Sequence, residues 1–215
     1  MASRQVKQGV GASVMALINH DKKYIFLHIY KTGGMSLRQL LSGEEEIGSH
    51  CSAIDLKETL YNTGKREVWD EYFKFAVVRN PYDWMVSLIG YITRFPSHGD
   101  HQQVSGMTMT EFLMFCRDVA MKRERPHGSN KYMTLTQFLC DKNKSLLADK
   151  VIKFENIDQE VAEIQKRLGI SFNTLPKKNI NGQRAKDYHT YFNQEAAGLV
   201  AEIHKDDLEL FQYEF

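Results

Sequence analysis

Two segments of the chain place a basic side chain beside hydroxyl or glycine residues, directly after an apolar run. Lys31-Thr-Gly-Gly-Met-Ser36 follows the run at 24–29, and Arg79 follows the run at 73–78, with Ser87 eight residues later. Basic side chains, hydroxyls and the backbone N–H groups of glycine turns are donors that proteins offer to phosphate-like anions. The two segments therefore predict two anion sites.

The first segment has the composition of a phosphate-binding turn. Gly33 and Gly34 let the backbone approach an anion closely, and Thr32 and Ser36 add hydroxyl donors. Lys31 adds a mobile cation, although it precedes the glycines, whereas the lysine of the nucleotide-triphosphatase P-loop follows them. A glycine pair after a strand also occurs in ordinary turns, so this segment alone leaves both interpretations open.

The second segment centres on Arg79, which ends an expected buried strand. Ligands gather at the carboxyl ends of strands in open α/β sheets, and an arginine can donate two parallel bonds to one phosphate. Ser87 lies about two turns into the next helix and adds a donor if that helix passes the same group. The alternative is an arginine that caps loop carbonyls and an idle serine. Together, the two segments predict a ligand with two separated anionic groups.

The elements that position these residues alternate between strand and helix. Apolar, β-favouring runs predict strands at 24–29, 73–78 and 150–154, and helical spacing predicts helices at 36–41, 84–92, 109–123, 132–140, 156–168 and 195–210. Residues 1–22 are expected to form an arm or a short helix, and residues 23–215 a single domain. This order predicts a three-layer α/β fold with a central, mainly parallel sheet flanked by helices.

Composition narrows the class of protein. Lys plus Arg total 28 against 27 Asp plus Glu, a balance that excludes a general nucleic-acid binder. The three cysteines, Cys51, Cys116 and Cys140, are widely spaced, which predicts neither a disulfide framework nor a zinc site. We find no signal peptide and no apolar run of membrane-spanning length, so we expect a cytoplasmic protein without a membrane partner. The sequence carries no signal for an oligomeric state.

Both segments resemble those of the sulfotransferases that use 3′-phosphoadenosine-5′-phosphosulfate (PAPS). Residues 26–37, FLHIYKTGGMSL, resemble the 5′-phosphosulfate loop of that family, HIPKTGGTSL, and residues 73–83 with Ser87 resemble its 3′-phosphate element, FxFVRNPYDRxxS. Further similarity lies in GSHCSA at 48–53, FEN at 154–156, LPKKN at 175–179 and DLELFQYEF at 207–215. The branch resembled contains the carbohydrate O-sulfotransferases of the heparan and chondroitin type and bacterial relatives, and it implies a P-loop-like fold.

The resemblance implies a role for each segment. PAPS is the expected co-substrate, and adenosine 3′,5′-bisphosphate (PAP) the expected product. Lys31 would stabilise the charge that grows on the leaving 5′-phosphate, supported by the N–H groups of Gly33, Gly34 and Met35. Arg79 and Ser87 would hold the 3′-phosphate. No acidic pair is placed to hold magnesium, so no metal is expected.

Other residues receive roles from the same resemblance. His50 occupies the histidine of the GHxSA-like segment and would be the general base for an acceptor hydroxyl. Arg184 and Lys186 lie in a late basic loop that would close over the 3′-phosphate. His28 is expected to be buried, and His98 and His101 to be solvated in a loop. The acceptor would be a small molecule or a glycan with a hydroxyl or, less favoured, an amine.

Three departures from the family pattern leave two alternatives open. Tyr30 replaces proline, Met35 replaces a hydroxyl residue, and Trp84 replaces arginine. We expect Tyr30 and Trp84 to enlarge the surface around the nucleotide. The alternatives are a P-loop nucleotide kinase, which the reversed order of lysine and glycines disfavours, and a non-catalytic module that binds adenosine bisphosphate.

Overall fold

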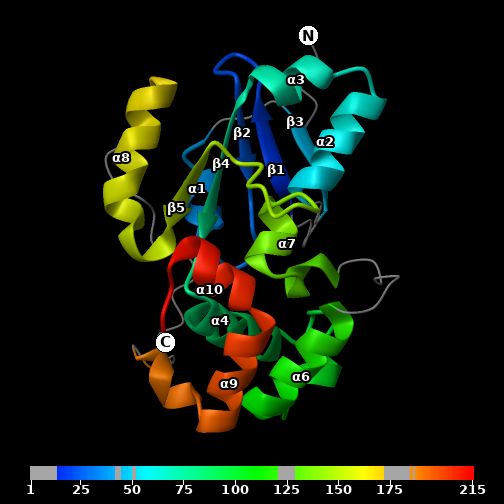
Figure 1. Cartoon of the computed structure of the whole chain (residues 1–215), viewed down its shortest axis with the longest axis vertical. Helices are drawn as coiled ribbons and strands as arrows, with labels where there is room; N and C mark the ends of the chain where they lie inside the picture. Colours follow the sequence, from blue (N-terminus) through cyan, green and yellow to red (C-terminus); the bar gives the residue numbers. More distant parts are fainter. Residues whose placement is uncertain (1–13, 42–44, 50–51, 121–128, 172–184, 186) are drawn as a thin grey trace.

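The computed structural model describes residues 14–41, 45–49, 52–120, 129–171, 185 and 187–215. Within these residues, five strands form one sheet with the order β3-β1-β2-β4-β5 (Figure 1). The strands are β1 (Val14–Asn19), β2 (Tyr24–Leu27), β3 (Glu45–Ser49), β4 (Phe73–Val78) and β5 (Lys150–Lys153).

The sheet joins a parallel half to an antiparallel half. The three expected strands, β2, β4 and β5, are parallel neighbours, with Phe26 opposite Phe75. β1 pairs antiparallel with both β2 and β3. The expectation of an arm or short helix over residues 1–22 is therefore wrong at 14–19. This run is only mildly apolar, and pairing on both sides together with burial of Ala16, Leu17 and Ile18 makes it a strand.

Helices make up most of the rest. They are α1 (Gly34–Arg38), α2 (Ala53–Asn62), α3 (Arg66–Glu71), α4 (Pro81–Arg94), α5 (His101–Val104), α6 (Met109–Ala120), α7 (Leu135–Leu139), α8 (Ile157–Leu168), α9 (Gln194–Ile203) and α10 (Lys205–Phe211). The helix expected over 195–210 is two helices that meet at His204, and the one expected at 132–140 begins only after its cap, Thr134. Among the described residues, no helix has the length and apolarity needed to cross a bilayer.

The two faces of the sheet bury separate cores. Leu17, Phe26 and Val77 belong to a cluster with α1 and α8 on one face. Ile25 and Val78 belong to a larger cluster on the other face, which includes residues of α2, α4, α6, α7 and α9. Alternate strand residues thus point to opposite helical layers. The three-layer α/β prediction is confirmed.

The site lies where β4 passes into α4. Arg79 and Asn80 separate the two elements, and the Asn80 side chain accepts a hydrogen bond from the Tyr82 N–H to cap the helix. Pro81 occupies the first helical position, where its missing N–H costs nothing. Figure 1 shows α4, α6, α9 and α10 gathered beyond the carboxyl end of β4.

Candidate functional site

The turn after β2 is built by two left-handed backbone positions. Lys31 has φ 64° and Gly33 has φ 85°. Between them Thr32 is fully buried, and its Oγ1 donates to the Ile29 carbonyl at 2.9 Å. The Thr32 hydroxyl is expected to donate to an anion, but in the structure it donates its hydrogen bond within the turn. Of Thr32, the backbone is therefore the part that is left to contact a ligand.

Both glycines are required by close packing. A Cβ on Gly33 would lie 2.5 Å from the ring of Phe154, and one on Gly34 would lie 2.2 Å from Cδ2 of His28. His28 is buried, as expected, with 4% of its surface exposed. A side chain at either glycine would collide with a ring, and the buried His28 ring beside Gly34 has little room to move.

The helix that follows the turn, α1, has only a weak dipole. α1 has five residues, so few peptide dipoles are aligned in it. Met35 is exposed, and the Ser36 N–H donates to the Gly33 carbonyl at 3.1 Å. The first N–H groups of a helix have no partner within the helix, so Gly34 and Met35 offer local donors rather than a strong dipole.

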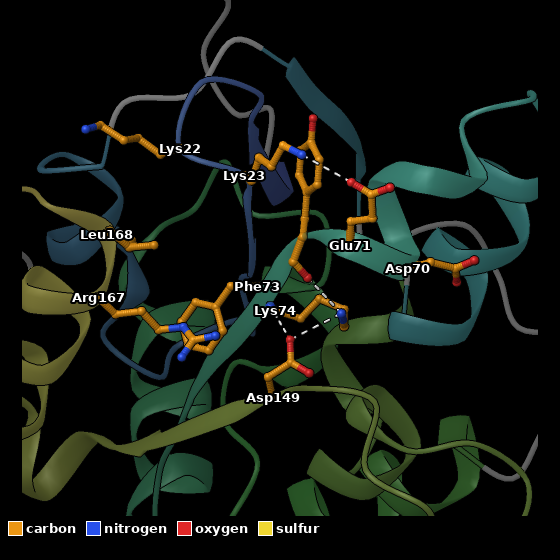
Figure 2. Close-up of a pocket in the computed structure, with 10 residues that line it drawn as sticks. Lys22, Lys23, Asp70, Glu71, Phe73, Lys74, Asp149, Arg167 and Leu168 are labelled. Atoms are coloured by element: carbon orange, nitrogen blue, oxygen red, sulfur yellow. Dashed lines mark hydrogen bonds and ion pairs between the residues drawn. The ribbon is translucent and has the colours of Figure 1, made fainter.

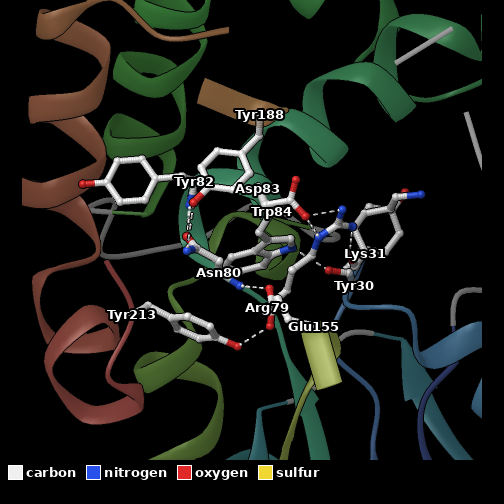
Figure 3. Close-up of polar contacts among 10 residues, drawn as sticks. All are labelled: Tyr30, Lys31, Arg79, Asn80, Tyr82, Asp83, Trp84, Glu155, Tyr188 and Tyr213. Atoms are coloured by element: carbon white, nitrogen blue, oxygen red, sulfur yellow. Dashed lines mark hydrogen bonds and ion pairs between the residues drawn. The ribbon is translucent and has the colours of Figure 1, made fainter. Parts of the chain in front are cut away.

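Arg79 is buried at the end of β4 and is held on three sides, two of which Figure 3 shows. Its Nε and Nη2 each lie 2.5 Å from Oδ2 of Asp83, and its Nη1 donates to the Lys31 carbonyl at 3.2 Å. The guanidinium also stacks 4.5 Å from the centre of the Phe154 ring. Since a guanidinium has five N–H donors, one N–H on each Nη has no acceptor among the residues that the structure describes. Burial lowers the pKa of Arg79 to about 10, opposed by Glu155, and the group stays charged at neutral pH.

The structure brings the two predicted segments together. The Arg79–Lys31 hydrogen bond joins residues 48 positions apart, and Phe154 packs against both Gly33 and Arg79. The lysine turn and the arginine therefore share one region at the carboxyl ends of β2 and β4, where the topology predicts a ligand.

One face of α4 carries a residue for each predicted site. Asp83, Ser87 and Tyr91 are four residues apart and so lie on the same side of the helix, over about 12 Å. Asp83 pairs with Arg79, and the ring of Tyr91 lies 4.1 Å from Nζ of Lys31. Ser87, between them, is half-buried, and within the described part of the chain its hydroxyl makes no hydrogen bond. A ligand along this face would meet Arg79 first and Lys31 last.

The Glu155 carboxylate, which has no predicted role, holds residues 213–214 against the site. Glu155 accepts bonds from the Asn80 N–H at 2.8 Å and from the Tyr213 hydroxyl at 2.9 Å. The Asn80 amide donates to the Glu214 carbonyl at 2.8 Å. The FEN and DLELFQYEF segments are thus tied to the RNPYD turn. Spacing alone could have suggested Asp83, four residues after Arg79, but Glu155 and Tyr91 needed the tertiary contacts.

The unusual residues Tyr30 and Trp84 contact one another. Trp84 is buried, with 1% of its surface exposed, and its Nε1 donates to the Tyr30 carbonyl at 2.7 Å. The expectation that Trp84 enlarges the surface around the nucleotide is therefore wrong. The side of α4 that points to the site carries Asp83 and Ser87, which are four residues apart. Trp84 lies on a different side of the helix, and its indole faces the core.

His98 and His101 are ordered parts of the structure rather than solvated side chains. Nδ1 of His98 accepts from the Asp100 N–H at 3.2 Å, and its Nε2 lies 3.5 Å from the Tyr30 hydroxyl. Burial, with Lys131 nearby, lowers the pKa of His98. Nδ1 of His101 lies 3.0 Å from the Ile92 carbonyl. No group of three or more His, Cys, Asp or Glu side chains among the described residues is placed to hold a metal ion.

Three expected site residues, His50, Arg184 and Lys186, lie outside the described residues. Their predicted roles as general base and as 3′-phosphate contacts therefore stay predictions.

An open pocket of about 570 Å³ lies away from this site (Figure 2). It surrounds Lys23 and Phe73 at the amino-terminal ends of β2 and β4. Four of its charged residues form two ion pairs, Lys23–Glu71 at 3.1 Å and Lys74–Asp149 at 3.2 Å. It contains none of the residues predicted to bind an anion.

A model of a protein family described as the sulfotransferase family matches residues 14–214. The chain belongs to this family. Searches of curated proteins and of solved structures found no significant match. Membership identifies the protein as a transferase of the sulfuryl group, and the matched residues span both the lysine turn and the arginine segment.

Proposed function

We propose that this sulfotransferase moves the sulfuryl group of PAPS to a hydroxyl of an acceptor, with a carbohydrate as the favoured class and an amine as the less favoured one. The observation that carries the proposal is the convergence of Lys31 and Arg79 beside one face of α4, joined by the 3.2 Å bond to the Lys31 carbonyl. PAPS has anionic groups at two separated positions, and this face presents cations at two separated positions.

The arginine end suits a 3′-phosphate. Asp83 and the Lys31 carbonyl use three N–H groups of Arg79, and within the described part of the chain one N–H on each Nη is left for a further acceptor. Ser87 follows on the same helix face and supplies a hydroxyl without breaking a bond inside the described structure. Arg184 and Lys186 are proposed to close over the same phosphate.

The lysine end suits the 5′-phosphosulfate. Gly33 and Gly34 have no side chain that would hold a ligand away from the backbone, and the N–H groups there and at Met35 are proposed to bind phosphosulfate oxygens. Sulfuryl transfer, like phosphoryl transfer, depends mainly on positioning and charge stabilisation. The Lys31 ammonium would stabilise the negative charge that develops on the leaving oxygen.

The acceptor hydroxyl must lose a proton as it attacks. We assign this role to His50, on the basis of the GHxSA-like segment. The proposal includes no metal. A cytoplasmic location is part of it, supported by Cys116 and Cys140, which are buried free thiols.

Two measurements test the proposal. Saturating PAP should raise the melting temperature, and transfer of labelled sulfate from PAPS to a panel of sugars, phenols and amines should identify the acceptor class. An unchanged melting temperature would contradict the nucleotide site. Binding of PAP without transfer to any acceptor would favour the non-catalytic module, and magnesium-dependent turnover of ATP would favour a kinase.

A further inference from the structure

We propose that Tyr91 is the positioning residue for Lys31, an inference that rests on the proposed function. The Lys31 ammonium lies 4.1 Å from the centre of the Tyr91 ring. Tyr91 is one helical turn beyond Ser87 on the face of α4 that follows the predicted nucleotide. The ring thus lies beside the end of the site where the sulfuryl group would be transferred.

An aromatic ring holds an ammonium differently from a carboxylate. The ring face attracts the cation through its quadrupole and adds no formal negative charge. At the other end of the same helix face, Asp83 pairs directly with Arg79 and offsets its charge. A lysine that must stabilise a developing anion benefits from a support that fixes its position but leaves its charge available.

The Tyr91 ring is itself fixed by other rings. Tyr30 meets it edge-on, with ring centres 5.6 Å apart, and His98 meets it in the same way at 5.8 Å. Phe95 packs against it at 4.9 Å. Tyr30 also replaces the proline of the family pattern directly before Lys31, so this chain supplies both the support and one of the rings that hold it.

The turn constrains the main chain of Lys31, and the Tyr91 ring contacts its side chain. Its φ of 64° and the bond from Arg79 to its carbonyl fix the backbone. A four-carbon side chain has several rotamers, and contact with the Tyr91 face favours one of them. Loss of the ring should therefore lower the rate of transfer more than the affinity for the nucleotide.

Replacement of the ring and its rescue test this role. Tyr91→Leu should lower kcat at saturating PAPS and acceptor by about 3- to 30-fold, while Tyr91→Phe, which keeps the ring, should stay near the wild-type rate. The Kd for PAP should change by less than about 3-fold in both variants, because Arg79 holds the other end of the nucleotide. The matched control is Tyr61→Leu, which removes a ring 5.5 Å from the Lys57 ammonium on α2 and should leave kcat unchanged.

A graded series of aromatic residues at position 91 tests the role even if Tyr91→Leu does not fold. Phenylalanines with one, two or three fluorine atoms at position 91 keep the size of the ring but progressively weaken its attraction for a cation. The logarithm of kcat should fall with each added fluorine. A flat series, or full kcat in Tyr91→Leu, would overturn the positioning role while wild-type transfer still supports the proposed function. If the wild-type protein neither binds PAP nor transfers sulfate, both proposals fail.

Discussion

The backbone carbonyl of Lys31 accepts a hydrogen bond from Nη1 of Arg79 at 3.2 Å, across 48 positions of sequence. This contact fixes the lysine turn relative to the end of β4. Because Asp83 holds the opposite edge of the guanidinium, Arg79 braces the turn and still has two N–H groups without an acceptor among the described residues.

Replacement of Arg79 with Ala should weaken PAP binding by about 10- to 100-fold. Each charge-assisted bond to a phosphate contributes about 1.5–3 kcal/mol, and 1.4 kcal/mol corresponds to a factor of ten. Isothermal titration calorimetry measures the change. Arg66→Ala is the matched control. Arg66 also forms an ion pair with an aspartate four residues later, Asp70, but on an exposed surface.

Arg79→Ala also leaves Asp83 without its partner, and the Asp83 side chain is only 14% exposed. If the single variant unfolds, Arg79→Ala with Asp83→Ala removes the isolated charge and should recover stability without recovering affinity. Wild-type affinity for PAP in either variant would refute the assignment of Arg79 to the 3′-phosphate.

Gly34→Ala should destabilise the fold, because its Cβ would lie 2.2 Å from the buried His28 ring. Overpacking of this kind costs about 1–3 kcal/mol. Gly198→Ala is the opposite case, because Gly198 lies within α9 and, among the described residues, no atom beyond its chain neighbours and the backbone of its own helix lies within 4 Å of an added Cβ. That substitution should stabilise by about 0.5–1 kcal/mol. Urea denaturation of both variants tests the pair, and equal effects would contradict the packing account.

Asp207→Ala should be among the more damaging substitutions outside the site. The Asp207 carboxylate is fully buried and accepts bonds from the Leu135 and Thr136 N–H groups at 2.8 and 2.7 Å, and Nδ1 of His204 lies 2.8 Å from it. Removal of one partner from such a buried network costs about 3–5 kcal/mol.

The neighbouring Asp206→Ala provides the control, since its ion pair with Lys144 is exposed. Pairs of that kind contribute about 0–1 kcal/mol. Thermal and chemical denaturation should separate the two variants clearly. Similar losses would mean that Asp207 does not anchor α10 to α7.

Stability should fall in weak acid partly through His98. Nδ1 of His98 accepts a hydrogen bond from the Asp100 N–H. A proton on Nδ1 would therefore place two N–H donors opposite each other. Burial, followed by the nearby charge of Lys131, lowers the pKa of His98 in the folded protein. The unfolded chain takes up the proton first, so the stabilising contribution is complete above the ordinary histidine pKa, about 6.5, and is lost as the pH falls below it.

His98→Gln should remove this contribution to acid sensitivity. The drop in melting temperature between pH 7.5 and pH 5.5 should be smaller in the variant than in the wild type. An identical drop in both proteins would show that His98 titrates normally in the folded state.

The sequence by itself determined the parallel half of the sheet and the two segments that carry the site. Long apolar runs such as 73–78 specify buried strands locally, and Lys31 and Arg79 each follow one of them. Carboxyl ends of adjacent parallel strands share one edge, so the meeting of these residues could be predicted before any contact was known.

Only the tertiary structure decided the antiparallel half and the partners of the basic residues. Val14–Asn19 becomes a strand because β2 and β3 pair with it, a long-range effect that its own mild pattern does not specify. The contact between Lys31 and the Tyr91 ring and the buried position of Trp84 depend on the rotation of α4 relative to the turn. Packing of the whole core sets that rotation, and no local spacing encodes it.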